Sequence, residues 1–255
     1  MLNIKNISKN FGGIKAVDNV SVQIQEGSIT GLIGPNGAGK TTLFNIICGS
    51  LKPSNGTITF KEKDITGLPS HELFYQGILR TFQIAHEFSK LTVLENLMVV
   101  PGFQTGESLI NSWINRTKIK NEEKIIKQKA LEVINFLNLS HLTYELAGNL
   151  SGGQKKLLEL GRCMMVDSNK IVLLDEVGAG VNRTLLNEIA DVIKKLNKEE
   201  GYTFCMIEHD IEFISKLCDK IIVMAEGKVL TEGKIEDIKK NEEVITAYLG
   251  RSGAV

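Results

Sequence analysis

The stretch from Gly34 to Thr41, with the sequence GPNGAGKT, combines three glycines, a lysine and a hydroxyl group at fixed spacing. Glycines let the backbone curl until successive N–H groups point inward, and such a turn at the start of a helix forms an anion site. A short apolar run precedes the stretch, and apolar residues at helical spacing follow it. The spacing Gly-x4-Gly-Lys-Thr therefore predicts a loop that binds the phosphates of ATP.

In this loop, Lys40 should reach the β- and γ-phosphates, and the Thr41 hydroxyl should be a ligand of Mg²⁺. Thr42 belongs to the same first helical turn. The predicted ATP-binding residues of the loop are Gly34, Pro35, Asn36, Gly37, Ala38, Gly39, Lys40, Thr41 and Thr42.

Two neighbouring acids, Asp175 and Glu176, follow the apolar run 171–174. Taken alone, this pattern also fits a buried strand that ends in solvated carboxylates. Beside a phosphate loop, we expect a strand adjacent to the loop's own strand, which would carry Asp175 to the carboxyl edge of the sheet. Asp175 would then hold Mg²⁺, directly or through water, and Glu176 would act as the general base that deprotonates the attacking water. The two motifs together predict hydrolysis of Mg-ATP.

A third motif, Leu150-Ser151-Gly152-Gly153-Gln154, opens a helical pattern with a serine and two glycines. The start of such a helix is a second anion cradle, but it lacks a lysine and a preceding strand and cannot close a phosphate site alone. An ordinary helix N-cap formed by Ser151 is the alternative interpretation.

These five residues are the signature of ABC ATPases, and the chain resembles that family over nearly its whole length. The resemblance implies that Phe11 stacks on adenine, that Gln83 contacts Mg²⁺ and the attacking water, and that His209 contacts the γ-phosphate. From the residues alone, Phe11 could instead be a core or hairpin aromatic, Gln83 a surface residue and His209 a helix N-terminal residue.

The resemblance implies one set of site residues. Catalytic roles fall to Lys40, Gln83, Glu176 and His209, metal ligation to Thr41, Gln83 and Asp175, and nucleotide contacts outside the loop to Phe11, Ser151, Gly153 and Gln154. Two positions depart from the family pattern: Val177 stands where most members have proline, and Asn182 stands where many have aspartate.

The resemblance also implies the partners. Two ATPase subunits, identical or paralogous, would face each other head to tail, with each ATP between the phosphate loop of one and the signature of the other. Integral-membrane permease subunits would convert this ATP-driven closure into transport. The chain would then lie peripherally at the cytoplasmic face of the inner or plasma membrane.

Within the family, the stretches 11–17, 77–83, 91–97 and 247–250 look like the ATP-binding subunit of branched-chain amino-acid importers, the LivG type. The related urea and amide importers share much of this pattern. A soluble ABC ATPase of translation or DNA repair is a less favoured interpretation, because the chain has one ATPase domain and no sustained heptads. A small-molecule kinase with a phosphate loop would lack the signature motif.

The elements that must position these residues follow from periodicity. Alternating strands are expected at 2–11, 17–25 and 56–65, and apolar strands alternate with amphipathic helices from 170 onward. This pattern predicts an α/β fold with a mostly parallel sheet. With the resemblance, it becomes a P-loop NTPase (RecA-like) core with an antiparallel β subdomain, residues 1–84 and 167–255, and an inserted α-helical signature subdomain, residues 85–166.

In that helical stretch, residues 120–139 should form a long charged helix whose amphipathic face is traced by Ile125, Ile126, Lys129, Val133 and Leu137. Such a helix could lie on a membrane or a partner, but a solvated surface helix is the favoured interpretation.

Composition limits the remaining possibilities. Lys+Arg and Asp+Glu both number 30 in the 255 residues, so the formal net charge is zero and no nucleic-acid partner is expected. No apolar run approaches the roughly 18 residues of a membrane span, so work at a membrane would require docking onto a protein that spans it. The four cysteines, at 48, 163, 205 and 218, lack metal-binding spacing and are predicted to be small buried apolar residues.

Overall fold

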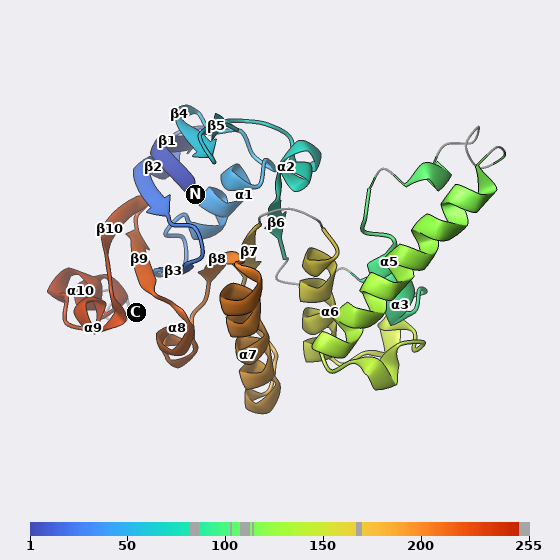
Figure 1. Cartoon of the computed structure of the whole chain (residues 1–255). Coiled ribbons are helices and arrows are strands. Elements are labelled where there is room, and N and C mark those ends of the chain that lie inside the picture. Colours follow the sequence, from blue (N-terminus) through green and yellow to red (C-terminus); the bar gives the residue numbers. More distant parts are fainter. Residues whose placement is uncertain (82–86, 103, 108–112, 114, 167–169, 250–255) are drawn as a thin grey trace. The chain divides into compact units, whose positions relative to one another are not determined.

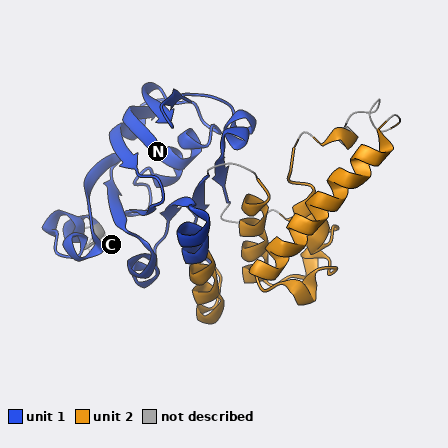
Figure 2. Ribbon diagram, viewed as in Figure 1, with its two compact units in different colours: residues 1–83, 168–179, 193–255 blue, residues 84–167, 180–192 orange. Residues whose placement is uncertain are grey.

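The computed structural model describes residues 1–81, 87–102, 104–107, 113, 115–166 and 170–249. Contacts within the chain define two compact units (Figure 2). Unit 1 comprises residues 1–83, 168–179 and 193–255, and unit 2 comprises residues 84–167 and 180–192. Residues 180–192 thus lie in unit 2, whereas the domains predicted from the sequence place them with the core. The predicted domain boundaries stay a prediction.

One sheet of unit 1 is antiparallel, with the strand order β2-β1-β4-β5 (Figure 1). Its strands are β1 (Leu2–Phe11), β2 (Ile14–Ile24), β4 (Asn55–Phe60) and β5 (Lys63–Asp64). The apolar side chains of Leu2 and Ile4 are buried while Lys5 is exposed, as expected for strands with one covered face. Gly12, with φ +57°, allows the tight turn between β1 and β2. The strands predicted at 2–11 and 17–25 are confirmed, and they pair as a hairpin.

The second sheet of unit 1 has the order β10-β9-β3-β8-β7-β6. Its strands are β3 (Ile29–Ile33), β6 (Ile78–Arg80), β7 (Ile171–Asp175), β8 (Thr203–Ile207), β9 (Lys220–Ala225) and β10 (Lys228–Gly233). The strands from β9 to β6 pair in parallel, and β10 pairs antiparallel to β9. Every residue of β3, β7 and β8 is buried, which is typical of parallel strands covered on both faces. The predicted α/β fold, with a mostly parallel sheet and an antiparallel β part, is confirmed.

The expectation that the acidic strand lies next to the loop strand is wrong, because β8 lies between β3 and β7. Ile207 of β8 pairs with Leu32 of β3 on one side and with Asp175 of β7 on the other. All three strands run in the same direction, so their carboxyl ends share one edge of the sheet. Asp175 therefore still reaches the edge at which the phosphate loop begins.

Helix α1 (Lys40–Ile47) packs within the core of unit 1. A single cluster of buried side chains includes Leu2 and Ile58 of the antiparallel sheet, Phe44 of α1 and Leu173 of the parallel sheet. A separate cluster contains Ile33 of β3, two side chains of β9 and side chains of the helices toward the C-terminus. The remaining helices of this unit are α2 (Ser70–Gln76), α8 (Ile211–Leu217), α9 (Ile235–Ile238) and α10 (Glu242–Leu249).

Unit 2 is mainly helical, in the stretch where helices were predicted. It contains α3 (Val93–Met98), α5 (Arg116–Phe136), α6 (Gly152–Met164) and three short 3₁₀ helices, η1 (Thr105–Glu107), η2 (Ser140–Leu142) and η3 (Ala147–Asn149). Helix α7 (Arg183–Glu200) begins in this unit and ends in unit 1. No helix in the described ranges has the length and apolar content needed to cross a membrane.

The predicted apolar face of α5 is wrong at its first position, because Ile125 is 69% exposed. The buried residues of α5 are Ala130, Val133 and Ile134, all in its second half. There, Gly161 of α6 lets the side chain of Val133 approach closely, since a Cβ at Gly161 would lie 3.2 Å from a Val133 methyl. The helix is therefore packed over its second half, and the first half is largely solvated.

All four cysteines are free thiols. Cys48, Cys163 and Cys205 are buried, as predicted, and Cys218 is half-buried. Burial raises the pKa of Cys205 to about 12 and also raises the pKa of Cys218. Thiolate, the reactive form, is therefore suppressed at both positions.

Candidate functional site

The phosphate loop follows β3 and has the backbone conformation that its glycines predict. Gly34, Gly37 and Gly39 have φ values of +150°, +80° and +96°. A Cβ at Gly34 would lie 2.0 Å from the carbonyl oxygen of Met224, and a Cβ at Gly39 would lie 2.4 Å from that of Ala16. At Gly37 nothing lies within 4 Å. Gly34 and Gly39 are thus required because another part of the backbone approaches them closely. Gly37 borders open space.

Lys40, the first residue of α1, is 6% exposed, and its ammonium group donates hydrogen bonds to the carbonyl oxygens of Gly34 (2.7 Å) and Pro35 (3.0 Å). Burial lowers the pKa of Lys40, and the carboxylates of Glu176 and Asp175 act in the opposite direction. The electrostatic influence of both acids on this ammonium indicates that the end of β7 and the phosphate loop share one site.

Asp175 is held by a buried guanidinium group. Its Oδ2 lies 2.6 Å from Nη2 of Arg80, and the two side chains are 7% and 9% exposed. Nη1 of Arg80 also donates to Oδ1 of Asn45 (2.5 Å) and to Sγ of Cys48 (3.4 Å). Arg80 on β6 therefore links the acid of β7 to side chains on and directly after α1.

Glu176 lies in a tight turn. Its φ is +50°, an uncommon value for a residue other than glycine. Its N–H donates to the carbonyl oxygen of Ile207 (2.9 Å), and its own carbonyl accepts from the N–H of Ala179 (3.1 Å). The ring nitrogen Nε2 of His209 lies 3.1 Å from Oε1 of Glu176. The structure thus brings together two of the residues predicted to be catalytic.

For the other predicted site residues of unit 1, the structure gives exposure and neighbours that are not themselves predicted site residues. Phe11 ends β1 and is 50% exposed, with Nζ of Lys9 at 5.4 Å from its ring centroid. Thr41 is exposed at the start of α1, and Thr42 is half-buried. Gln83 lies outside the described residues.

The signature motif starts α6 with a capping box. The hydroxyl of Ser151 accepts from the N–H of Gln154 (3.4 Å), and Oε1 of Gln154 accepts from the N–H of Ser151 (2.9 Å). A Cβ at Gly153 would lie 1.9 Å from a methyl group of Leu185, whereas nothing lies within 4 Å of a Cβ at Gly152. Packing against α7 explains Gly153, and Gly152 leaves open space beside the backbone.

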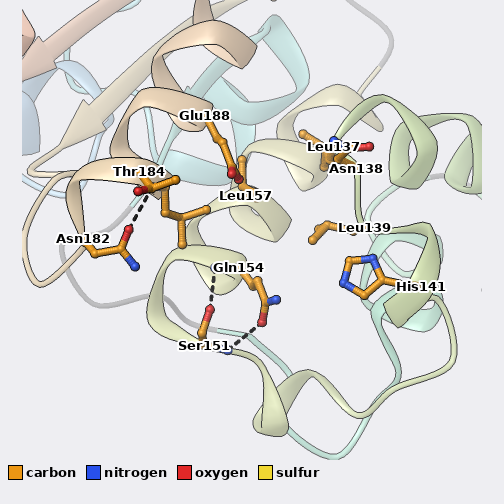
Figure 3. A pocket seen from close by; sticks show the side chains of 11 residues that line it. Leu137, Asn138, Leu139, His141, Ser151, Gln154, Leu157, Asn182, Thr184 and Glu188 are labelled. Atoms are coloured by element: carbon orange, nitrogen blue, oxygen red, sulfur yellow. Dashed lines mark hydrogen bonds between the residues drawn. The ribbon is translucent and has the colours of Figure 1, made fainter.

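A pocket of about 520 Å³ in unit 2 lies beside this helix start (Figure 3). Ser151 and Gln154 line it on one side and Asn182 and Glu188 on another, and His141 contributes from η2. The remaining lining residues are Leu137, Asn138, Leu139, Leu157, Thr184 and Leu185.

Residues 17–179 match the sequence profile of the ABC transporter family, and this span includes the phosphate loop, the signature motif and the acid pair. This chain belongs to the ABC transporter family. It is an ATP-binding subunit of that family, and it is an ATPase with a P-loop NTPase core.

Relatives of this ABC ATPase match it almost end to end. A probable branched-chain amino acid transport ATP-binding protein LivG from Archaeoglobus fulgidus is 45% identical over 98% of this chain and 95% of its own length. The ADP conformation of an ATP-binding cassette of an ABC transporter has 39% identity, covers 98% of both chains and gives a TM-score of 0.83. A dimeric bacterial ABC transporter cassette has 27% identity over 92% of this chain and 99% of its own, with a TM-score of 0.75.

The structure explains how the ABC ATPase accommodates its two departures from the family pattern. Val177 is 1% exposed and occupies the second position of the turn from Glu176 to Ala179, where proline is favoured but not required. Oδ1 of Asn182 accepts from the N–H of Leu185 (3.0 Å) just before α7 begins, which is the capping bond that an aspartate would also make. Neither substitution removes a local hydrogen bond that the fold needs.

Three residues that support the predicted site of the ABC ATPase, directly or through Arg80, were missed from the sequence: Asn45, Arg80 and Glu208. Oε1 of Glu208 accepts from the N–H of Gly178 (2.9 Å), and Glu208 is 5% exposed. A sequence signal existed for two of them, because Arg80 and Glu208 are charged residues that end or directly follow apolar strands. Asn45, on a helix, carried no such signal.

The oxygen donors of the ABC ATPase fit a hard cation such as Mg²⁺, which prefers one or two carboxylates together with hydroxyl, water and phosphate oxygens. Thr41 supplies an exposed hydroxyl beside the loop, and Asp175 supplies a carboxylate whose electrostatic influence reaches Lys40. Among the described residues, no group of three or more His, Cys, Asp and Glu side chains could hold a metal ion. A site that is completed by phosphate oxygens is consistent with this donor set.

Proposed function

We propose that this ABC ATPase is the motor subunit of an importer of branched-chain amino acids. It would lie at the cytoplasmic face of the membrane and dock onto integral-membrane permease subunits. The observation that supports this most is the 45% identity to a LivG-type relative over 98% of the chain. Similarity of that extent includes the helical unit as well as the ATP site.

Within one subunit, the loop from Gly34 to Thr42 would hold the phosphates of ATP and Phe11 would stack on the adenine. Lys40 would exchange its two carbonyl partners for phosphate oxygens, since its ammonium already binds two carbonyl oxygens of the loop. Thr41, Asp175 and Gln83 would hold Mg²⁺, which neutralises charge on the phosphates when it is bound.

Glu176 would accept a proton from the attacking water, and His209 would contact the γ-phosphate. The contact between Nε2 of His209 and Oε1 of Glu176, at 3.1 Å, supports a shared task for the two side chains. A base placed within hydrogen-bond reach of the water typically contributes 10²–10⁴-fold, on the order of several kcal/mol.

A second subunit, identical or paralogous, would complete the site in a head-to-tail dimer. Ser151, Gly153 and Gln154 of one subunit would approach the ATP held by the other. Gln154 closes the capping box within its own chain, so its contribution would be to fix the helix start. The open space at Gly152 gives room for a phosphate beside the backbone N–H groups.

Transport in proteoliposomes tests the substrate. The chain would be co-expressed with candidate permease and paralogous ATPase subunits from its own genome, and reconstituted with a candidate substrate-binding protein. We expect copurification with the permeases and ATP-dependent uptake of labelled leucine, isoleucine and valine, with loss of uptake in Lys40→Ala. Uptake of urea or short amides in place of these amino acids would support the role as a transporter ATPase but contradict the proposed substrate. Copurification with ribosomes or DNA alone would contradict the proposed role in transport.

A further inference from the structure

Glu208 is a buried carboxyl group to which the proposed reaction assigns no role. It follows β8, directly precedes His209 and is 5% exposed. Its Oε1 accepts the N–H of Gly178 at 2.9 Å. Gly178 is two residues beyond Glu176, so this bond connects the segment that carries the histidine to the turn that carries the base.

The Glu176 turn needs such external support. Glu176 has φ +50°, and residues other than glycine keep such a conformation only where their surroundings hold it. Before the turn, the N–H of Glu176 is fixed by the carbonyl oxygen of Ile207 (2.9 Å). After it, the N–H of Gly178 is fixed by Glu208. Two consecutive residues of one segment, Ile207 and Glu208, therefore hold both sides of the turn.

We propose that Glu208 is a positioning residue that fixes the Glu176 turn and thereby aims the Glu176 carboxylate and its contact with His209. This inference rests on the proposed function, in which Glu176 is the general base. Glu208 acts through the backbone of Gly178 and does not touch the nucleotide.

The environment of Glu208 argues that the carboxyl group has a specific task. The pKa of Glu208 is raised to about 7, mainly by burial and also by the nearby carboxylates of Glu176 and Asp210, although hydrogen bonds from the N–H groups of Gly178 and His209 act in the opposite direction. Burial and two nearby negative charges both make an ionised carboxylate at this position unfavourable. A glutamine would supply the same oxygen acceptor without the charge, which makes the role testable with a nearly isosteric pair of variants.

The test compares Glu208→Met, which keeps the volume and removes the acceptor, with Glu208→Gln, which keeps the acceptor. We expect Glu208→Met to lower kcat about tenfold or more, because small misplacements of a catalytic group are costly, with the KM for ATP within about twofold of the wild type. Glu208→Gln should retain at least about half of kcat. Hydrogen exchange at the Gly178 amide, measured by NMR without nucleotide, should accelerate about tenfold or more in Glu208→Met only.

A matched control removes a similar bond far from the site. Oδ2 of Asp219 accepts the N–H of Ile29 at 2.8 Å, at the opposite end of β3. Asp219→Ala should leave kcat unchanged. If Glu208→Met keeps kcat within about twofold while Glu176→Gln loses turnover, the positioning role is overturned and the base stands. If Glu176→Gln also keeps its turnover, the proposed base itself is rejected.

Discussion

The carboxylate of Glu176, the proposed general base, is held in a strained turn and faces a histidine, so its removal should affect chemistry more than binding. Replacing Glu176 with glutamine preserves the volume and the backbone bonds to Ile207 and Ala179, which involve no side-chain atoms. We expect Glu176→Gln to bind ATP with near-normal affinity, to lose about 10²–10⁴-fold in turnover and to accumulate an ATP-bound dimer. Nucleotide titration, phosphate release and size-exclusion chromatography measure the three effects. Turnover at the wild-type level would remove Glu176 from the role of base.

Glu208 gives a second prediction at this scale, in the pH dependence of stability. Its pKa is about 7 in the folded chain against an ordinary value of 4.5. Between these values the folded protein keeps the proton that the unfolded chain loses, so the free energy of unfolding falls as pH rises from 4.5 to 7 and levels off above. The shift corresponds to about 3 kcal/mol.

Urea denaturation from pH 4.5 to 8 measures this effect, with Glu208→Gln as the reference that lacks the proton. The wild type should lose stability relative to Glu208→Gln over this range. A difference between the two proteins that does not change with pH would contradict the raised pKa.

At the scale of the elements, two neighbouring glycines at the start of α6 test how this helix packs against α7. A Cβ at Gly153 would meet Leu185 at 1.9 Å, and a Cβ at Gly152 would meet nothing. Gly153→Ala should therefore lower the free energy of unfolding by about 1–3 kcal/mol. Gly152→Ala should change stability by less than about 0.5 kcal/mol. Chemical denaturation of both variants is the measurement, and equal effects would show that Leu185 does not determine the requirement at Gly153.

The link between β6, β7 and α1 rests on the buried pair of Arg80 and Asp175. Arg80→Ala would leave the carboxylate buried without its guanidinium partner, and we expect a loss of about 3–5 kcal/mol in the free energy of unfolding. A matched control is Lys216→Ala, which removes the exposed pair with Glu212 and should cost under about 1 kcal/mol. A similar small loss in both variants would contradict the structural importance of the buried pair.

At the scale of the whole molecule, a shared ATP site predicts complementation between two inactive subunits. Lys40→Ala should remove phosphate binding by the loop. Ser151→Arg should block the signature motif with a large side chain at its exposed serine. A dimer with one subunit of each kind would combine one intact loop with one intact signature. We expect each variant alone to be inactive. Each mixed dimer should recover up to about half of the turnover of a wild-type dimer, because it has one intact composite site in place of two. Tagged heterodimers purified in two steps provide the measurement, and inactive heterodimers would contradict site sharing.

Much of this architecture could be predicted from local pattern, because apolar periodicity and glycine spacing are short-range properties. The hairpin of β1 and β2, the phosphate loop and the apolar strand before Asp175 all belong to this class. The order of strands does not, since the position of β8 between β3 and β7 depends on pairing between distant segments. The exposed Ile125 shows the same limit, because periodicity marks a face but not the length over which a neighbour covers it.

The site follows the same division. The motifs predicted the site residues, and the structure brings Lys40, Glu176 and His209 into one unit with Asp175. The supporting contacts could not be predicted, since Arg80 and Asp175 are 95 residues apart and Gly178 and Glu208 are 30 apart. Such pairs arise only when the sheet places strand ends side by side.

The buried cysteines make this protein convenient for site-directed spectroscopy. Cys48, Cys163 and Cys205 are shielded from solvent, and the raised pKa values of Cys205 and Cys218 disfavour the thiolate that maleimides attack. A single cysteine introduced at Trp113, whose side chain is 85% exposed, should therefore react far faster with a fluorescent dye or a spin label than the native thiols. Distances between labelled subunits of the proposed dimer could then be followed during ATP hydrolysis without building a cysteine-free background.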